Sequence, residues 1–92
     1  MRISAVQKDI LFVLYQLELR GFLKPIPATD ILTMLNKSRV TEVFGTNFRV
    51  SCHKLNENGL VHMHRSLQTF RLSFTLTELG REKANMELLN HI

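Results

Sequence analysis

The segment TNFRVSCHKLNENGLV, residues 46–61, places polar and basic side chains on about two turns of an expected helix. An arginine can pair with guanine O6 and N7, and an asparagine with adenine N6 and N7, so such side chains can read base edges in duplex DNA. Taken alone, however, a polar helix face with a few basic residues is more often only a solvated surface. The surrounding elements must decide between these interpretations. The candidate residues are Thr46, Asn47, Arg49, Val50, His53 and Lys54.

Length and composition narrow the class of protein. The chain has 92 residues, of which 45% are hydrophobic, so we expect one globular domain over residues 1–92. The formal net charge of +4 favours a polyanionic partner. The single cysteine excludes a disulfide within the chain, and the first residues lack the layout of a signal peptide. The longest apolar run, residues 10–15, is too short to span a membrane, so we expect a cytoplasmic protein.

Patterns for catalysis and metal binding are weak. The sequence has no glycine-rich phosphate loop and no nucleophile in a recognisable motif, so we do not expect an enzyme. Cys52, His53, His62 and His64 are metal-ligating residue types, and the last two share one strand face. Their spacing nevertheless matches no common ligand pattern. We therefore expect neither a metal nor a cofactor.

Capping signals and apolar spacing predict the first two helices. The first spans residues 4–20, with Ser4 and Gln7 at capping-box spacing and Gly21 just past its end. Two prolines, at positions 25 and 27, bracket a turn that precedes a second helix over residues 28–36. The first helix is apolar on more than one side, which predicts burial on more than one side.

A third helix is predicted over residues 46–58, where Thr46 can cap the start and Gly59 the end. The segment before it, residues 36–45, can extend the second helix, form an extra helical turn or be a loop. Its apolar residues, Val40, Val43 and Phe44, favour a packed conformation. Within the third helix, Phe48, Cys52 and Leu55 follow i, i+4, i+7 spacing and are expected to face the core.

A β-hairpin and a last helix complete the predicted order. Residues 60–65 and 70–76 have the character of two antiparallel strands with a short connection. Thr77 can then cap a helix over residues 78–90. In the second strand, Phe70, Leu72, Phe74 and Leu76 are expected to point inward. In the last helix, Leu79, Met86, Leu88 and Leu89 give an apolar side.

Three helices, a hairpin and a helix are the order of an α+β, mostly α, winged helix-turn-helix domain: a three-helix core, a two-stranded β wing and a C-terminal helix. FRVSCHKLNENGLV resembles the recognition helix of MarR and PadR regulators, with Phe48, Cys52, Leu55, Gly59 and Leu60 at the recurring positions. FTLTELGREKA, residues 74–84, is similar to the Leu-Thr-x-x-Gly stretch that ends the wing in both families. The resemblance covers nearly the whole chain and implies a DNA-binding regulator.

In such a fold the polar face of residues 46–58 enters the major groove. Arg49 and Asn47 are then placed to contact bases, and Val50 a thymine methyl. Thr46 and the helix N-terminus favour a phosphate, while His53 and Lys54 lie nearer the backbone. At the hairpin tip we expect backbone or minor-groove contacts, and before the helix a phosphate contact. These further candidates are Arg65, Gln68 and Arg71 in the wing, and Ser38 and Arg39.

The surplus of apolar residues on the first helix predicts a homodimer, which would present two recognition helices to two half-sites. Candidate interface residues are Leu11, Tyr15, Met86 and Leu89. The expected function is sequence-specific binding of double-stranded DNA by a small dimeric transcriptional regulator. Two alternatives stay open: a winged-helix protein-interaction module, and a DNA-binding protein of plasmid or phage replication or partition. No residue pattern identifies a small-molecule effector.

Overall fold

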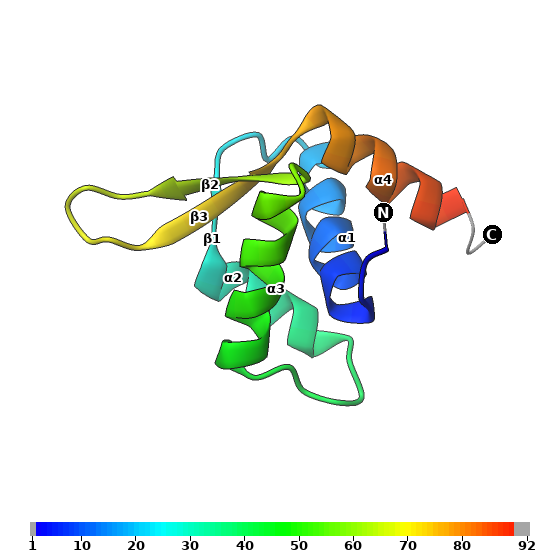
Figure 1. The fold of residues 1–92 in the computed structure, drawn as a ribbon, viewed down its shortest axis with the longest axis horizontal. Coiled ribbons are helices and arrows are strands. Elements are labelled where there is room, and N and C mark those ends of the chain that lie inside the picture. Colours follow the sequence, from blue (N-terminus) through cyan, green and yellow to red (C-terminus); the bar gives the residue numbers. More distant parts are fainter. Residues whose placement is uncertain (1, 90–92) are drawn as a thin grey trace.

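The structure is a computed structural model that describes residues 2–89, with only the backbone described for Leu88 and Leu89. Its helices pack together, and a β-hairpin extends well beyond them on one side (Figure 1). The elements in chain order are α1 (Ala5–Leu19), β1 (Ile26–Pro27), α2 (Ala28–Lys37), α3 (Gly45–Glu57), β2 (Val61–Arg65), β3 (Leu72–Leu76) and α4 (Glu78–Leu89).

Both ends of α1 are closed as the sequence predicts. At the start, Ser4 Oγ accepts a hydrogen bond of 3.2 Å from the backbone N–H of Gln7. At the end, Gly21 adopts a φ of 94°, and the N–H of Phe22 donates to the carbonyl of Leu17 at 3.0 Å. Gly21 thus ends the helix in the left-handed conformation, which a glycine adopts without steric cost.

The core runs along α1 and includes a residue that the sequence analysis placed elsewhere. Ile10 and Leu14 are buried as expected, but Leu11 is also buried, at 1% exposure, in the same hydrophobic cluster. The prediction that Leu11 lies at a dimer interface is therefore wrong, because its side chain is buried in the core of the same chain and is not available to a second copy.

A third strand, which was not predicted, widens the sheet. Ile26 pairs with Phe74 and Pro27 with Ser73, so β1 joins the outer side of β3 and the strand order is β1-β3-β2. Proline is tolerated here because β1 is an edge strand. The segment of two prolines, interpreted as a turn, thus also ties the start of α2 to the base of the wing.

Residues 38–44 form a loop held by one polar side chain. The amide of Asn36 donates to the carbonyl of Val43 at 3.0 Å and accepts from its N–H at 2.9 Å. Val43 is buried, whereas Val40 and Phe44 are exposed at 106% and 72%. The prediction that all three apolar residues pack is therefore right only for Val43, the residue that this side-chain amide fixes.

The third helix starts one residue earlier than predicted. α3 begins at Gly45, and its N-cap is Phe44, whose backbone is extended and whose side chain offers no acceptor. Thr46 lies inside the first turn, so the prediction that it caps the helix is wrong: a capping side chain must precede the helical backbone. The predicted end is confirmed, because Gly59 has a φ of 74° and the N–H of Leu60 donates to Leu55 at 2.9 Å.

The wing is the β2–β3 hairpin, in register from Val61 opposite Leu76 to Arg65 opposite Leu72. Phe74 and Leu76 are buried and Leu72 is half-buried, as the alternation predicts. Phe70 is an error of that prediction, because it lies outside β3 with a φ of 57° and 70% exposure. Its left-handed backbone breaks the two-residue period before the strand begins.

The wing and α4 meet at a close junction. The Thr77 hydroxyl donates to the carbonyl of Gly59 at 2.6 Å and accepts from the N–H of Gly80 at 2.9 Å, which caps α4 as predicted. The N–H of Thr77 also donates to the carbonyl of Leu60 at 3.2 Å. A Cβ on Gly80 would lie 1.8 Å from that same carbonyl oxygen. The two segments that carry the MarR and PadR resemblance are thus in direct contact.

Candidate nucleic-acid interface

One face of α3 is buried and the opposite face is exposed. Phe48, Cys52 and Leu55 are at most 5% exposed, which confirms the predicted inward stripe; Ser51 joins them. Val50, on the other side, is 53% exposed although it is apolar. All six candidates of the opening segment lie on the exposed face: Thr46, Asn47, Arg49, Val50, His53 and Lys54.

The basic residues of α3 and the wing are not neutralised by the chain. The side chains of Arg49, Lys54, Arg65 and Arg71 form no hydrogen bond or ion pair with any residue that the structure describes. No acidic residue occurs between Glu57 and Glu78. The ion pairs in residues 2–89 lie on other elements: Lys8 and Lys83 with Glu87, Arg39 with Asp9, and Arg81 with Glu18.

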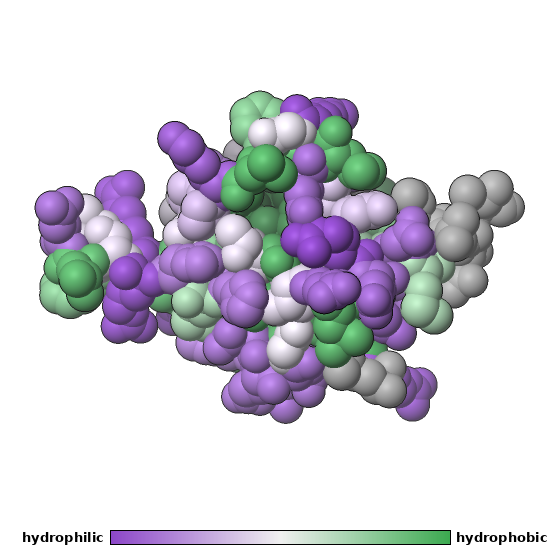
Figure 2. Space-filling model, turned by 90° about the horizontal axis from the view of Figure 1, so that it is seen from above, coloured by the Kyte–Doolittle hydropathy of each residue, from purple (hydrophilic) through white to green (hydrophobic). Residues whose placement is uncertain are grey.

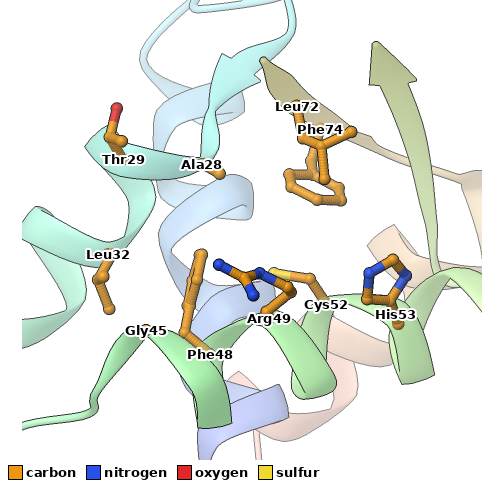
Figure 3. Close-up of a pocket in the computed structure, with 10 residues that line it drawn as sticks. All are labelled: Ala28, Thr29, Leu32, Gly45, Phe48, Arg49, Cys52, His53, Leu72 and Phe74. Atoms are coloured by element: carbon orange, nitrogen blue, oxygen red, sulfur yellow. The ribbon is translucent and has the colours of Figure 1, made fainter. Parts of the chain in front are cut away.

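A cavity of about 180 Å³ lies between α3, β3 and the first half of α2. Arg49 and His53, one turn apart, extend from α3 on the side of this cavity, with Leu72 and Phe74 across it (Figure 3). Arg49 thus lines a largely apolar cavity and its guanidinium has no partner among the described residues, whereas Lys54 does not line the cavity.

The wing tip, residues 66–71, is closed by its own hydrogen bonds. The Ser66 N–H donates to the carbonyl of Arg71 at 3.0 Å, and the Phe70 N–H to that of Ser66 at 2.9 Å. The Ser66 hydroxyl accepts from the N–H groups of Gln68 and Thr69, both at 3.3 Å. Arg65, Gln68 and Arg71 are all exposed there, so the structure gathers the three predicted wing residues at one end of the molecule.

Apolar side chains share this tip, and sequence reasoning missed them. Leu67 is 90% exposed and Phe70 is 70% exposed. A view from above shows apolar atoms among polar ones at the end of the wing (Figure 2). The signal available in the sequence was the position of Leu67 inside a short polar connection, where no core can cover it.

Ser38 and Arg39 are bonded to residues of α1, α2 and the loop itself. The guanidinium of Arg39 pairs with Asp9 of α1 and also donates to the carbonyl of Thr41 at 3.0 Å. Ser38 donates to the carbonyl of Leu35 at 3.4 Å. Arg39 therefore connects the loop to α1. In the protein without DNA, the carboxylate of Asp9 already neutralises its charge.

The metal-ligating residue types do not gather. His62 and His64 are neighbours on β2, with ring centroids 6.4 Å apart, and His64 hydrogen-bonds the Thr75 hydroxyl at 2.9 Å. Among the described residues no three histidine, cysteine or acidic side chains are placed to hold a metal ion. Cys52 is buried beneath α3, and this burial raises the pKa of its thiol to about 12.

The remaining dimer candidates lie along α1 and α4. Met86 is 57% exposed on α4. Tyr15 is half-buried, and its hydroxyl donates to the side-chain oxygen of Asn85 at 3.4 Å. The side chain of Leu89 lies outside the described part of the structure.

No helix within residues 2–89 is long and apolar enough to cross a membrane.

Solved structures of other proteins share this fold, and the names of two of them refer to repression or to DNA binding. RosR of H. salinarum has a TM-score of 0.77 and 23% identity, and covers 94% of this chain and 71% of its own. The adhesin competence repressor AdcR of Streptococcus pyogenes has a TM-score of 0.72 and 19% sequence identity, and the match covers 98% of this chain. A Ralstonia eutropha protein to which DNA binding is ascribed has a TM-score of 0.73 and 18% sequence identity. The match covers 92% of this chain and 96% of the Ralstonia chain.

This chain spans little more than half of AdcR, 57% of its length. No protein-family model matches the sequence, and no curated protein matches it. At these identities the likeness extends to the fold. Together with the helix order, the sheet and the projecting hairpin, it establishes that the chain has the winged helix-turn-helix fold.

Proposed function

We propose that the protein is a transcriptional regulator that binds duplex DNA sequence-specifically, with α3 in the major groove and the wing against the backbone or minor groove. The observation that carries the proposal is the unpaired basic surface of α3 and the wing. Arg49, Lys54, Arg65 and Arg71 have no partner within the described residues, whereas Lys8, Arg39, Arg81 and Lys83 are ion-paired. The other basic residues without a partner in that part of the chain, Arg2, Arg20, Lys24 and Lys37, lie on neither α3 nor the wing. Phosphates would supply the missing counter-charge.

The exposed residues of α3 then form two groups, one near the start of the helix and one further along it. Asn47, Arg49 and Val50 lie in the first two turns, from which recognition helices contact bases. His53 and Lys54 follow and would meet the backbone. Phe44 leaves the first N–H groups of α3 without a side-chain acceptor, so a phosphate can bind them.

The names of the similar structures support a regulatory role. AdcR is named a repressor, and DNA binding is ascribed to the Ralstonia eutropha protein. The segments 46–61 and 74–84 resemble MarR and PadR regulators, and we propose that the chain is related to them. The homodimer is also a proposal, now supported by the exposed Met86 and no longer by Leu11.

The test is fluorescence anisotropy with random-sequence duplex DNA over a salt series, beside sedimentation for mass. We expect an affinity that falls linearly with salt on a double-logarithmic scale, because bound phosphates release counter-ions. The absence of binding even at low salt would refute the proposal and favour the protein-interaction alternative. Binding that persists without any sequence preference after selection would favour a role in replication or partition.

A further inference from the structure

Two large apolar side chains are displayed where the molecule is furthest from its core. Leu67 and Phe70 are 90% and 70% exposed at the wing tip, beyond the last strand pair, Arg65 with Leu72. Exposing such groups to water is unfavourable, and the tip offers nothing in residues 2–89 to cover them. This position is at the leading end of the wing, which the proposed function brings to DNA (Figures 1 and 2).

The backbone holds these side chains outward instead of letting them collapse. Phe70 has a φ of 57°, which is strained for a bulky residue, and it would otherwise continue the inward face of Leu72 and Phe74. The hydrogen bonds of Ser66 close the loop around that conformation. The apolar display is therefore built into the turn.

Charge around the tip selects the partner. Arg65 and Arg71 stand at its two ends, both exposed and unpaired within the described residues, and no acidic residue occurs from position 58 to position 77. Apolar side chains flanked by arginines are complementary to a DNA groove, because phosphates line its two edges and stacked base pairs form its base. Proteins that insert apolar side chains between base steps from the minor groove do so with such basic neighbours.

We propose that Leu67 and Phe70 form an apolar wedge that enters the DNA minor groove, partly separates two stacked base pairs and bends the duplex. This inference rests on the proposed DNA binding and adds a specific mode of it. Flexible pyrimidine–purine steps such as TA would be preferred at the wedge, because they unstack at the lowest cost.

The experiment uses the full chain and a short duplex rich in TA steps. One copy of the duplex carries 2-aminopurine within those steps, and another carries a donor and an acceptor dye at its ends. Phe70→Gly removes the ring and relieves the strained backbone, so it should keep or raise the unfolding temperature. Leu67→Ala removes the second side chain, Phe70→Leu keeps an apolar one, and Leu19→Ala trims an exposed leucine of α1 as the matched control.

We expect the unchanged protein, Phe70→Leu and Leu19→Ala to raise 2-aminopurine fluorescence and end-to-end energy transfer. Phe70→Gly and Leu67→Ala should lose both signals and about tenfold in affinity, yet retain salt-sensitive binding. Duplex binding by the unchanged protein without either signal would overturn the wedge and leave the proposed function standing. No duplex binding would overturn both. Capture of anionic vesicles that depends on Phe70, without unstacking of DNA, would assign the tip to a membrane surface and overturn the wedge.

Discussion

At the scale of single residues, the basic side chains of α3 differ in what supports them. Arg49 lies beside an apolar cavity and has a planar donor group suited to guanine, whereas Lys54 projects from the helix as a point charge. We predict that Arg49→Ala costs about 1–3 kcal/mol on a selected site and relaxes the preference at one base pair. Lys54→Ala should weaken all sequences about equally and reduce the salt slope by about one ion.

Anisotropy titrations on the selected site and on its single-base variants check this pair. Lys24→Ala, which removes an exposed positive charge from the loop after α1, is the control and should change affinity little. Equal losses for Arg49→Ala on every sequence would show that Arg49 contacts phosphate and that the bases are read by other residues.

The thiol beneath α3 gives a prediction with a defined pH window. Burial raises the pKa of Cys52 from 9.0 to about 12, so the folded chain keeps the thiol proton where the unfolded chain loses it. The stability that this group contributes is complete below pH 9.0 and is lost as pH rises toward about 12. At mildly alkaline pH, iodoacetamide should therefore label the folded protein far more slowly than the protein in urea.

A cysteine at an exposed position of the same helix, Asn56→Cys in a Cys52→Ala background, is the comparison and should react fast in the folded state. If native Cys52 reacts as fast as this exposed thiol, then α3 opens readily from the core, contrary to the packing described above.

Residue-scale prediction from sequence succeeded where a period governs burial and failed where a distant partner does. Phe48, Cys52 and Leu55 were placed correctly because helical spacing alone puts them on one side. The ion pair of Arg39 was not predicted, because its partner, Asp9, is 30 positions away in the chain. Phe70 was misjudged because alternation carries no information about a left-handed residue before the strand.

At the scale of elements, the junction between the wing and α4 decides how the hairpin is oriented. Gly80 lets the first turn of α4 approach the carbonyl of Leu60, where an added Cβ would lie 1.8 Å from the oxygen. That atom is backbone and is itself hydrogen-bonded by Thr77, so it cannot move cheaply. We predict that Gly80→Ala lowers the free energy of unfolding by about 2–3 kcal/mol, measured by urea denaturation followed by circular dichroism.

Gly45→Ala is the matched control, because a Cβ there meets no atom within 4 Å and the position is helical. It should raise stability by about 0.5 kcal/mol. A Gly80→Ala variant as stable as the unchanged protein would show that α4 can shift away from the wing, and the junction would not fix the orientation of the hairpin.

Elements with their own end signals were predictable, and elements made by pairing were not. Ser4, Gly21, Gly59 and Thr77 mark helix ends through local chemistry, and all four do so in the structure. β1 has two residues and exists only because Phe74 and Ser73 of β3 lie beside it. Its formation depends on contacts 46 to 48 positions away, which no local pattern contains.

At the scale of the whole molecule, the number of recognition helices sets what one copy can contact. The chain extends 42 × 29 × 26 Å along its principal axes, and the half-sites of dimeric helix-turn-helix proteins lie roughly 34–36 Å apart. Although the long axis exceeds that spacing, one copy has one α3, so it presents one recognition helix to one half-site. Two copies would double the phosphate contacts, which is the reason to expect a dimer on DNA.

Met86, the exposed apolar residue that α4 contributes among the described dimer candidates, provides the test of that dimer. Met86→Glu would bury a charge in an apolar contact, so we predict that sedimentation shows the unchanged protein at twice the chain mass and this variant at the chain mass. Thr33→Glu adds the same charge at an exposed position of α2 and should leave the mass unchanged. On DNA, Met86→Glu should keep binding to one half-site but lose the added affinity of two correctly spaced half-sites. A mass of one chain for the unchanged protein, on and off DNA, would rule out the dimer and leave a monomeric winged-helix binder.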